Sequence, residues 1–234
     1  MIVKPSDSAG SDDVTLCLSC DDVKNAFTHI MANKAVGSNG LGLVNKAVLV
    51  QEYLEGTEYV VDMVSLNGHH KVVAVRENDK GSCDGAKFVM FGMRPQSPSD
   101  ENISEIVAYQ KQVITALGVQ NGPTHGVVKW TNGSPCLVDV GARCHGGEGM
   151  WTPVANSLYG YNQVEVTAAA YLDTTLYASY PDEPSTSTGR WWMRTMPASG
   201  RWRTRGYSWW SSSRQQADSE EAKEGGVSLV ECCL

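Results

Sequence analysis

Alternating apolar and polar positions predict a chain built mainly of short strands. The clearest pattern is a pair of apolar runs, residues 123–130 and 135–143, separated by Thr131-Asn132-Gly133-Ser134. Asn-Gly between two such runs is the strongest short-range signal for a β-hairpin. Alternation along the second run places Asp139, Gly141 and Arg143 on one face. An acid and a base before a glycine-rich stretch suit a metal-bound phosphate, and a salt-bridged strand edge is an equal alternative.

The same reading predicts further strands on the N-terminal side of this hairpin. Asn67-Gly68 is a second hairpin turn, whereas residues 76–87 are polar and predicted to be irregular. The expected strands are residues 2–5, 14–18, 48–54, 59–66 and 71–75, with a short apolar run at 88–91.

Apolar positions recurring every three to four residues predict three helices. The first opens with Asp21-Asp22, acids that suit a helix N-terminus. The second begins after Asp100 as a capping residue and continues to Leu117. The third spans residues 162–172.

The chain changes character from about Pro184 onward. Five of the seven tryptophans fall between residues 186 and 213 among arginines and serines, with few aliphatic residues to pack against them. Residues 184–234 are therefore predicted to form an irregular or disordered tail. A basic aromatic nucleic-acid segment is one interpretation, and a mis-translated reading frame is the preferred one.

Composition narrows the classes of function. With 234 residues, 41% apolar and 19% charged, the chain has the composition of a soluble globular protein. A net charge of −7 argues against nucleic acid as a partner, because such binding needs a basic surface. No run is long enough to span a membrane and no signal peptide is visible. Seven cysteines without a CxxC pair indicate free thiols in a reducing compartment, so a cytoplasmic location is expected.

A glycine- and serine-rich tip follows the first strand. Lys4 and Pro5 lead into residues 6–11, whose small side chains leave backbone N–H groups open to an anion. The segment differs from a P-loop because GxxxxGK[ST] is absent. A mobile loop without a ligand is the alternative.

Taken in order, these motifs resemble the ATP-grasp superfamily. The segments are VKP with its Ser/Gly loop, QEYLEGTEY, THGVVKW and LVDVGAR, and then HGGEG and GYNQVE, which look like the carboxylate–amine ligase branch and are similar to L-amino-acid ligases. The resemblance covers about residues 2–180. It implies an α+β fold of antiparallel sheets with packed helices in two lobes. Residues 1–183 would form a partial domain, with a small nucleotide-binding lobe to about residue 65 and a larger catalytic lobe from about 66 to 183.

The resemblance also implies a chemistry and the residues that carry it. ATP would lie between the lobes and phosphorylate a carboxylate, and an amine would then displace phosphate to form an amide or peptide bond. Small carboxylate and amine molecules would thus be the other ligands. The implied ATP contacts are Lys4, the backbone of Ser8, Gly10 and Ser11, the adenine-lining Gln51, Glu52, Tyr53 and Leu54, and the carboxylate Glu58. A surface role for Lys4 and a solvated turn position for Glu58 are the alternatives.

The implied metal and substrate residues lie on and after the central hairpin. Asp139 would hold Mg²⁺, of which the family uses two ions, with Mn²⁺ as an alternative. Arg143 would be the catalytic residue that stabilises the transferring phosphoryl group. His145, Gly146 and Gly147 would approach the substrate carboxylate. A structural role for His145 is equally open.

Two departures from the family pattern affect the expected function. The family has His-x-Glu on the first strand of the hairpin, and the metal-bridging glutamate is replaced here by Val127, while His125 is expected to be structural. The family also has a preceding N-terminal domain, so the domain is expected to be incomplete at its N-terminus. The predicted function is an ATP-dependent carboxylate–amine ligase or a degenerate fragment of one. The alternatives are a non-catalytic nucleotide-binding or interaction module and a partial gene product without its own activity.

Overall fold

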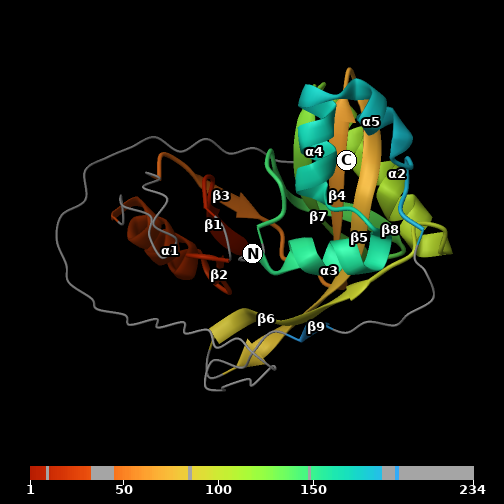
Figure 1. The fold of residues 1–234 in the computed structure, drawn as a ribbon. Helices are drawn as coiled ribbons and strands as arrows, with labels where there is room; N and C mark the ends of the chain where they lie inside the picture. Colours follow the sequence, from red (N-terminus) through yellow and green to blue (C-terminus); the bar gives the residue numbers. More distant parts are fainter. Residues whose placement is uncertain (9–10, 33–44, 84–85, 147–148, 186–192, 195–234) are drawn as a thin grey trace, which may run out of the picture. The chain divides into compact units, whose positions relative to one another are not determined.

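The computed structural model describes residues 1–8, 11–32, 45–83, 86–146, 149–185 and 193–194 (Figure 1). The chain divides into two compact units between Tyr53 and Leu54. The sequence placed this boundary later, near residue 65. The difference arises because the strand that follows Leu54 hydrogen-bonds within the large sheet of the second unit.

The first unit contains a small antiparallel sheet in the order β2-β1-β3. Its elements are β1 (Ile2–Pro5), β2 (Thr15–Leu16), α1 (Cys20–Ala32) and β3 (Val48–Gln51). Ala26 and Ile30 of α1 pack against Val3 and Val48 of the sheet. The helix begins where the acids predicted it, because Asp22 Oδ2 accepts hydrogen bonds from the backbone N–H of Leu18 and of Ser19.

The second unit is organised around an antiparallel sheet whose described strands run in the order β8-β7-β4-β5-β6-β9. These strands are β4 (Thr57–Leu66), β5 (His69–Cys83), β6 (Ala86–Pro95), β7 (Gly122–Thr131), β8 (Ser134–Gly141) and β9 (Met193–Arg194). The helices of this unit are α2 (Glu101–Ala116), α3 (Trp151–Tyr159), α4 (Gln163–Leu172) and α5 (Thr174–Ser179).

Both predicted Asn-Gly hairpins are present. Asn67 and Asn132 have φ of 51°, and the glycines that follow them have φ of 79°. Two successive residues at positive φ are what a two-residue type I′ turn requires, and its twist matches that of the strands it joins. These turns fix the pairing of β4 with β5 and of β7 with β8.

The two faces of the large sheet are covered by different helices. On one face, Ile103, Ile106 and Ile114 of α2 pack against Val61 and Val128 of the sheet. On the opposite face, α3 and α4 cover Ala74 and Val64 respectively. A view along the sheet shows α2 and α4 on either side of it (Figure 1). This second face also carries the polar residues described below.

Several predicted elements differ from the observed ones. Residues 76–87 were predicted to be irregular, which is wrong, because β5 continues through them as far as Cys83. Its polar side chains Arg76 and Asn78 are buried, whereas Glu77 between them is only half-buried and Asp79 is exposed, so polarity did not indicate a loop. The strands predicted at 14–18 and 48–54 are shorter than expected, and the sequence did not predict α3 or α5.

The predicted helices are confirmed, and the capping side chain of one of them is seen to bond. Asp100 and Leu117 flank α2, although the Asp100 side chain makes no cap hydrogen bond. Asn162 caps α4, and its side-chain oxygen accepts from the backbone N–H of Glu165 at 3.0 Å. The predicted irregular tail lies almost entirely outside the described residues, apart from residues 184–185 and the two of β9, which pair with Gly92 and Met93.

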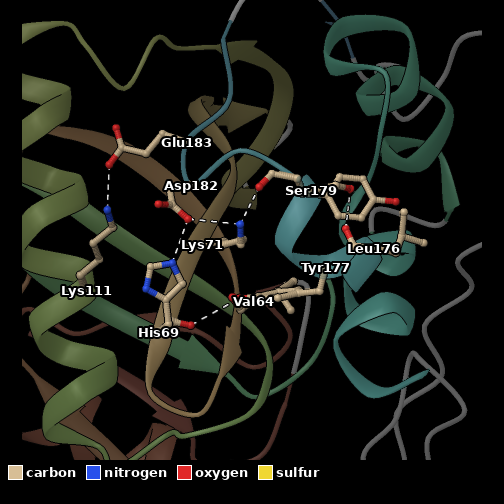
Figure 2. Close-up of polar contacts among 10 residues, drawn as sticks. Val64, His69, Lys71, Lys111, Leu176, Tyr177, Ser179, Asp182 and Glu183 are labelled. Atoms are coloured by element: carbon tan, nitrogen blue, oxygen red, sulfur yellow. Dashed lines mark hydrogen bonds and ion pairs between the residues drawn. The ribbon is translucent and has the colours of Figure 1, made fainter. Parts of the chain in front are cut away.

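The segment that follows α5 is tied back to the sheet and to α2 (Figure 2). The Asp182 carboxylate lies 2.8 Å from His69 Nε2 and 3.2 Å from Lys71 Nζ, and Glu183 pairs with Lys111 at 2.7 Å. Residues 182–183 therefore still belong to the packed second unit. Among the described residues, no helix is both long and apolar enough to cross a membrane.

Candidate functional site

The second sheet face also carries three cross-strand rows of side chains. The pairing of β4 with β7 and of β7 with β8 aligns Glu58 with Lys129, Val60 with Val127 and Asp139, and Asp62 with His125 and Gly141. Directly paired residues point to the same face of a sheet. We call this surface the polar face. It is opposite to the face that α2 covers.

Val127 and Asp139 are direct cross-strand partners. Side chains in such a pair have Cβ atoms about 4.5–5.5 Å apart, close enough for two carboxylates to share a cation. Valine offers no ligand atom, and Val127 is 9% exposed and part of the buried core. The hairpin therefore presents one carboxylate, Asp139, where a pair of ligating acids would fit.

Arg143 follows the end of β8 and turns back over it. A Cβ built on Gly141 would meet Arg143 Nε at 3.6 Å and Cζ at 3.7 Å, so the arginine side chain lies along the face on which Gly141 and its partner His125 point. Its Nη1 donates to the carbonyl of Cys144 at 3.0 Å, and the side chain is otherwise exposed. The expected alternation of Asp139, Gly141 and Arg143 thus ends at Gly141, yet the guanidinium still reaches the polar face.

The third row contains one half of a buried ion pair. Asp62 of β4 and Arg76 of β5 have side chains with no exposed surface, and Arg76 Nη2 donates to Asp62 Oδ2 at 2.6 Å. The guanidinium also lies 4.1 Å from the ring centroid of Trp151, the first residue of α3. Burial alone would raise the pKa of Asp62, but the charge of Arg76 and the hydrogen bond from His125 hold it at about 2.

Two histidines meet at the second oxygen of Asp62. His125 Nδ1 lies 2.8 Å from Asp62 Oδ1, and His145 Nδ1 lies 3.2 Å from His125 Nδ1. The two rings stack with centroids 4.7 Å apart. Burial, followed by the nearby charge of Arg76, lowers the pKa of His145 to about 3, so its imidazole is neutral at physiological pH.

The ligand atoms of Asp62, His125 and His145 all lie within 4.8 Å of one another, close enough to be considered for a metal ion. The hydrogen bond between Asp62 and His125 and the buried guanidinium of Arg76 disfavour an additional positive charge at this point. We therefore interpret the three residues as a hydrogen-bonded network. In this network His125 has a defined partner and is more than a packing residue.

The first row of the polar face is a second charged group. Glu58 is 8% exposed, accepts from Asn78 Nδ2 at 2.7 Å and pairs with Lys80 Nζ at 2.6 Å. The interpretation of Glu58 as a solvated turn acid is therefore wrong: it lies on β4 and is buried by its partners. Lys129 Nζ donates to the carbonyl of Leu54 at 2.7 Å, and burial lowers the pKa of this lysine.

The remaining predicted nucleotide residues lie in the first unit. Lys4 is half-buried on β1 and pairs with Leu49, and Gln51 ends β3. Glu52 and Tyr53 follow β3 and are exposed. Ser8 and Ser11 are the described parts of the predicted anion-binding tip, and Ser11 has a φ of 63°. Gly10 and, in the other unit, Gly147 lie outside the described residues.

The second unit brings together Asp139, Arg143 and His145 from the predicted set, along with three residues that the sequence did not single out. Gly146, another of the predicted substrate residues, follows His145 and is exposed. Asp62, Arg76 and Trp151 were missed as functional candidates. A carboxylate inside the apolar run YVVDMV and an arginine inside VVAVRE were the available signals, because buried charges in strands require partners.

Known proteins share sequence and fold with this chain. A family model described as an ATP-grasp domain matches residues 1–151. Dapdiamide A synthase of Enterobacter agglomerans is 31% identical over 173 residues, which are 74% of this chain and 39% of that protein. The chain therefore spans well under half the length of this relative.

Solved structures show the same fold at lower identity. The L-amino acid ligase from Bacillus licheniformis matches with a TM-score of 0.57 and 20% identity, over 79% of this chain and 42% of that one. The biotin carboxylase domain of 2-oxoglutarate carboxylase from Hydrogenobacter thermophilus, solved with MgADP and bicarbonate, matches with a TM-score of 0.54 and 14% identity. That match covers 78% of this chain and 38% of that one.

Proposed function

The chain belongs to the ATP-grasp family, and we propose that it joins a carboxylate to an amine in an ATP-dependent reaction through an acyl phosphate. The observation that carries the proposal is the placement of Asp139 and Arg143 on one face of the central hairpin. A carboxylate and a guanidinium side by side suit the binding of a phosphoryl group that a cation accompanies. The likeness to dapdiamide A synthase supports an amide-forming reaction over other ATP-dependent chemistry.

Each unit supplies its own proposed contacts. In the first unit, Lys4 is proposed to contact phosphate oxygens and residues 51–53 to line the adenine. In the second unit, Arg143 is proposed to stabilise the transferring phosphoryl group, and its exposed fork suits such a ligand. The Leu54 carbonyl already accepts from Lys129, so any adenine contact there shares this acceptor. Glu58 is proposed to act on the nucleotide through its partner Lys80.

The residues fit one metal ion better than two. Asp139 is an exposed carboxylate oxygen donor of the kind that Mg²⁺ prefers, and Mn²⁺ accepts the same ligands. Val127 occupies the opposite position and removes the second acid. We propose that Asp139 helps to hold the magnesium that accompanies ATP. No step of the proposed reaction depends on a second protein-bound ion.

Nucleotide binding is tested by thermal melting with and without Mg-ATP. A ligand that binds only the folded state stabilises it by about 2.7 kcal/mol at a hundredfold excess over Kd. Lys4→Ala should reduce the rise in Tm, whereas Lys46→Ala, an exposed lysine of the same unit, should leave it unchanged. An equal rise in both variants would remove Lys4 from the site, and no rise in the wild type would contradict nucleotide binding.

Catalysis is tested by ADP release in the presence of amino acids. We expect the wild type to release ADP in an amino-acid-dependent manner. In Arg143→Ala the rate of this release should fall by at least 10²-fold while Mg-ATP binding is retained, as expected for a group that acts on the transition state. ADP release that is unchanged in this variant would contradict the role of Arg143.

A second function is favoured by one observation, the valine at position 127. A module that binds nucleotide without turnover would retain Asp139 and lose its partner acid. Val127→Glu distinguishes the two functions, because the register places the new carboxylate directly opposite Asp139. Turnover that appears only in Val127→Glu would identify the natural chain as the non-catalytic form, and turnover in the wild type would establish the ligase.

A further inference from the structure

The arrangement around His125 defines which of its ring nitrogens carries the proton. Asp62 Oδ1 lies 2.8 Å from His125 Nδ1, and Asp62 Oδ2 is held by Arg76 at 2.6 Å. A carboxylate accepts hydrogen bonds and donates none, so the hydrogen of this contact belongs to His125 Nδ1. Because Asp62 and Arg76 are fully buried, this orientation of the carboxylate is fixed.

The second neighbour of His125 Nδ1 is compatible with the same assignment. His145 Nδ1 lies 3.2 Å away, and the stacked imidazole is neutral, so this nitrogen can present a lone pair to the N–H of His125. The Asp62 carboxylate fixes the proton on His125 Nδ1, and the contact with His145 does not oppose it. The neutral imidazole of His125 consequently carries its free lone pair on Nε2.

His125 lies in the part of the polar face where the proposed chemistry takes place. His125 is the direct strand partner of Gly141, against which the Arg143 side chain packs. The His125 side chain is 12% exposed, so it is reachable while its partner Asp62 is not. A buried carboxylate that orients an imidazole is an arrangement that activates nucleophiles, and the guanidinium proposed to bind phosphate is adjacent to it.

We propose that His125 Nε2 is the general base that accepts the proton of the attacking amine, with Asp62 as the residue that positions it. The proposal rests on the proposed function. The neutral amine attacks the acyl carbon, the C–N bond forms, and the C–O bond to phosphate breaks with release of inorganic phosphate. The amine proton moves to His125 Nε2, and the resulting imidazolium is stabilised by Asp62 before it releases the proton to water.

Hydroxylamine separates this step from formation of the acyl phosphate. It is largely unprotonated at neutral pH and traps an acyl phosphate as a hydroxamate without a base. In His125→Gln, amide formation should fall by about 10²–10⁴-fold, the usual contribution of a general base, whereas ATP-dependent hydroxamate formation should stay within a few-fold of the wild type. His69→Gln, at an exposed histidine of the same sheet, serves as the control and should change neither rate.

The outcomes distinguish the two proposals. Equal loss of hydroxamate and amide in His125→Gln would show a structural role and overturn the assignment, as would unchanged amide formation. Wild-type protein that forms no hydroxamate with any amino acid would contradict the proposed function instead.

If the wild type forms no hydroxamate, the role of His125 is tested by the protonation of its ring, which requires no turnover. Nitrogen-15 NMR of the histidine rings should show His125 protonated on Nδ1 and bare on Nε2, and Asp62→Asn should abolish this preference. A His125 that is protonated on Nε2 in the wild type would overturn the proposal.

Discussion

His145 makes the folded protein sensitive to acid well above the range in which carboxylates titrate. The pKa of its imidazole is lowered from 6.5 to about 3 by burial and by the charge of Arg76. Below pH 6.5 the His145 imidazole therefore binds a proton in the unfolded chain but stays neutral in the folded chain. The stabilising contribution is fully present above pH 6.5 and is lost as the pH falls from 6.5 towards 3.

The size of this effect follows from the two pKa values. Between pH 7.5 and 5.5 the free energy of unfolding should fall by about 1.4 kcal/mol through His145 alone. This amount is insensitive to the folded-state pKa provided that it lies below about 4.5, because the folded imidazole is then neutral throughout the interval.

Urea denaturation of the wild type and of His145→Gln at pH 7.5 and 5.5 measures the difference directly. The variant should lose about 1.4 kcal/mol less than the wild type over this interval. His70, whose pKa burial also lowers, contributes equally to both proteins. His69→Gln, at a side chain that is 60% exposed, is the matched control. The same pH dependence in the wild type and in His145→Gln would refute the buried, neutral imidazole.

Two further predictions concern stability. Gly56→Ala should lower the free energy of unfolding by more than about 1 kcal/mol, because Gly56 has a φ of +132° and an added Cβ would clash with the Trp130 carbonyl oxygen. Gly133→Ala, which has open space around it, should lower the midpoint of thermal melting less than Gly56→Ala does. Arg76→Met should lower the free energy of unfolding, measured by urea denaturation, by about 3–5 kcal/mol, because it leaves the buried Asp62 charge without its partner. A decrease below about 1 kcal/mol would show that Asp62 is not charged in the folded state.

Two elements show which features local sequence patterns can predict and which they cannot. The Asn-Gly turns at residues 67 and 132 were predicted from neighbouring residues and are present, because a type I′ turn depends on φ at two adjacent positions. The strand that begins near Lys71 was predicted to end at Val75, because Arg76 and Asn78 are polar, but in the structure β5 continues to Cys83. The burial of these two polar residues depends on Asp62 and Glu58, residues on the preceding strand whose side chains satisfy them.

The ordered motifs were enough to predict an α+β ATP-grasp fold with antiparallel sheets, which the family match and the solved neighbours confirm. They also identified Val127 as a departure, and the register then placed it opposite Asp139. The sequence predicted a structural role for His125, because a lone histidine on a strand gives no sign of its partners.

The sequence by itself determined the period of each strand, the turns and the order of motifs, since these depend on residues close together in the chain. Only the tertiary structure decided that Asp62, Arg76, His125 and His145 converge. They come from β4, β5, β7 and the segment after β8, and the strand pairing that joins Asp62 to His125 closes 63 residues of chain. Such a contact is selected by the burial and pairing of whole strands, which no local pattern of residues encodes.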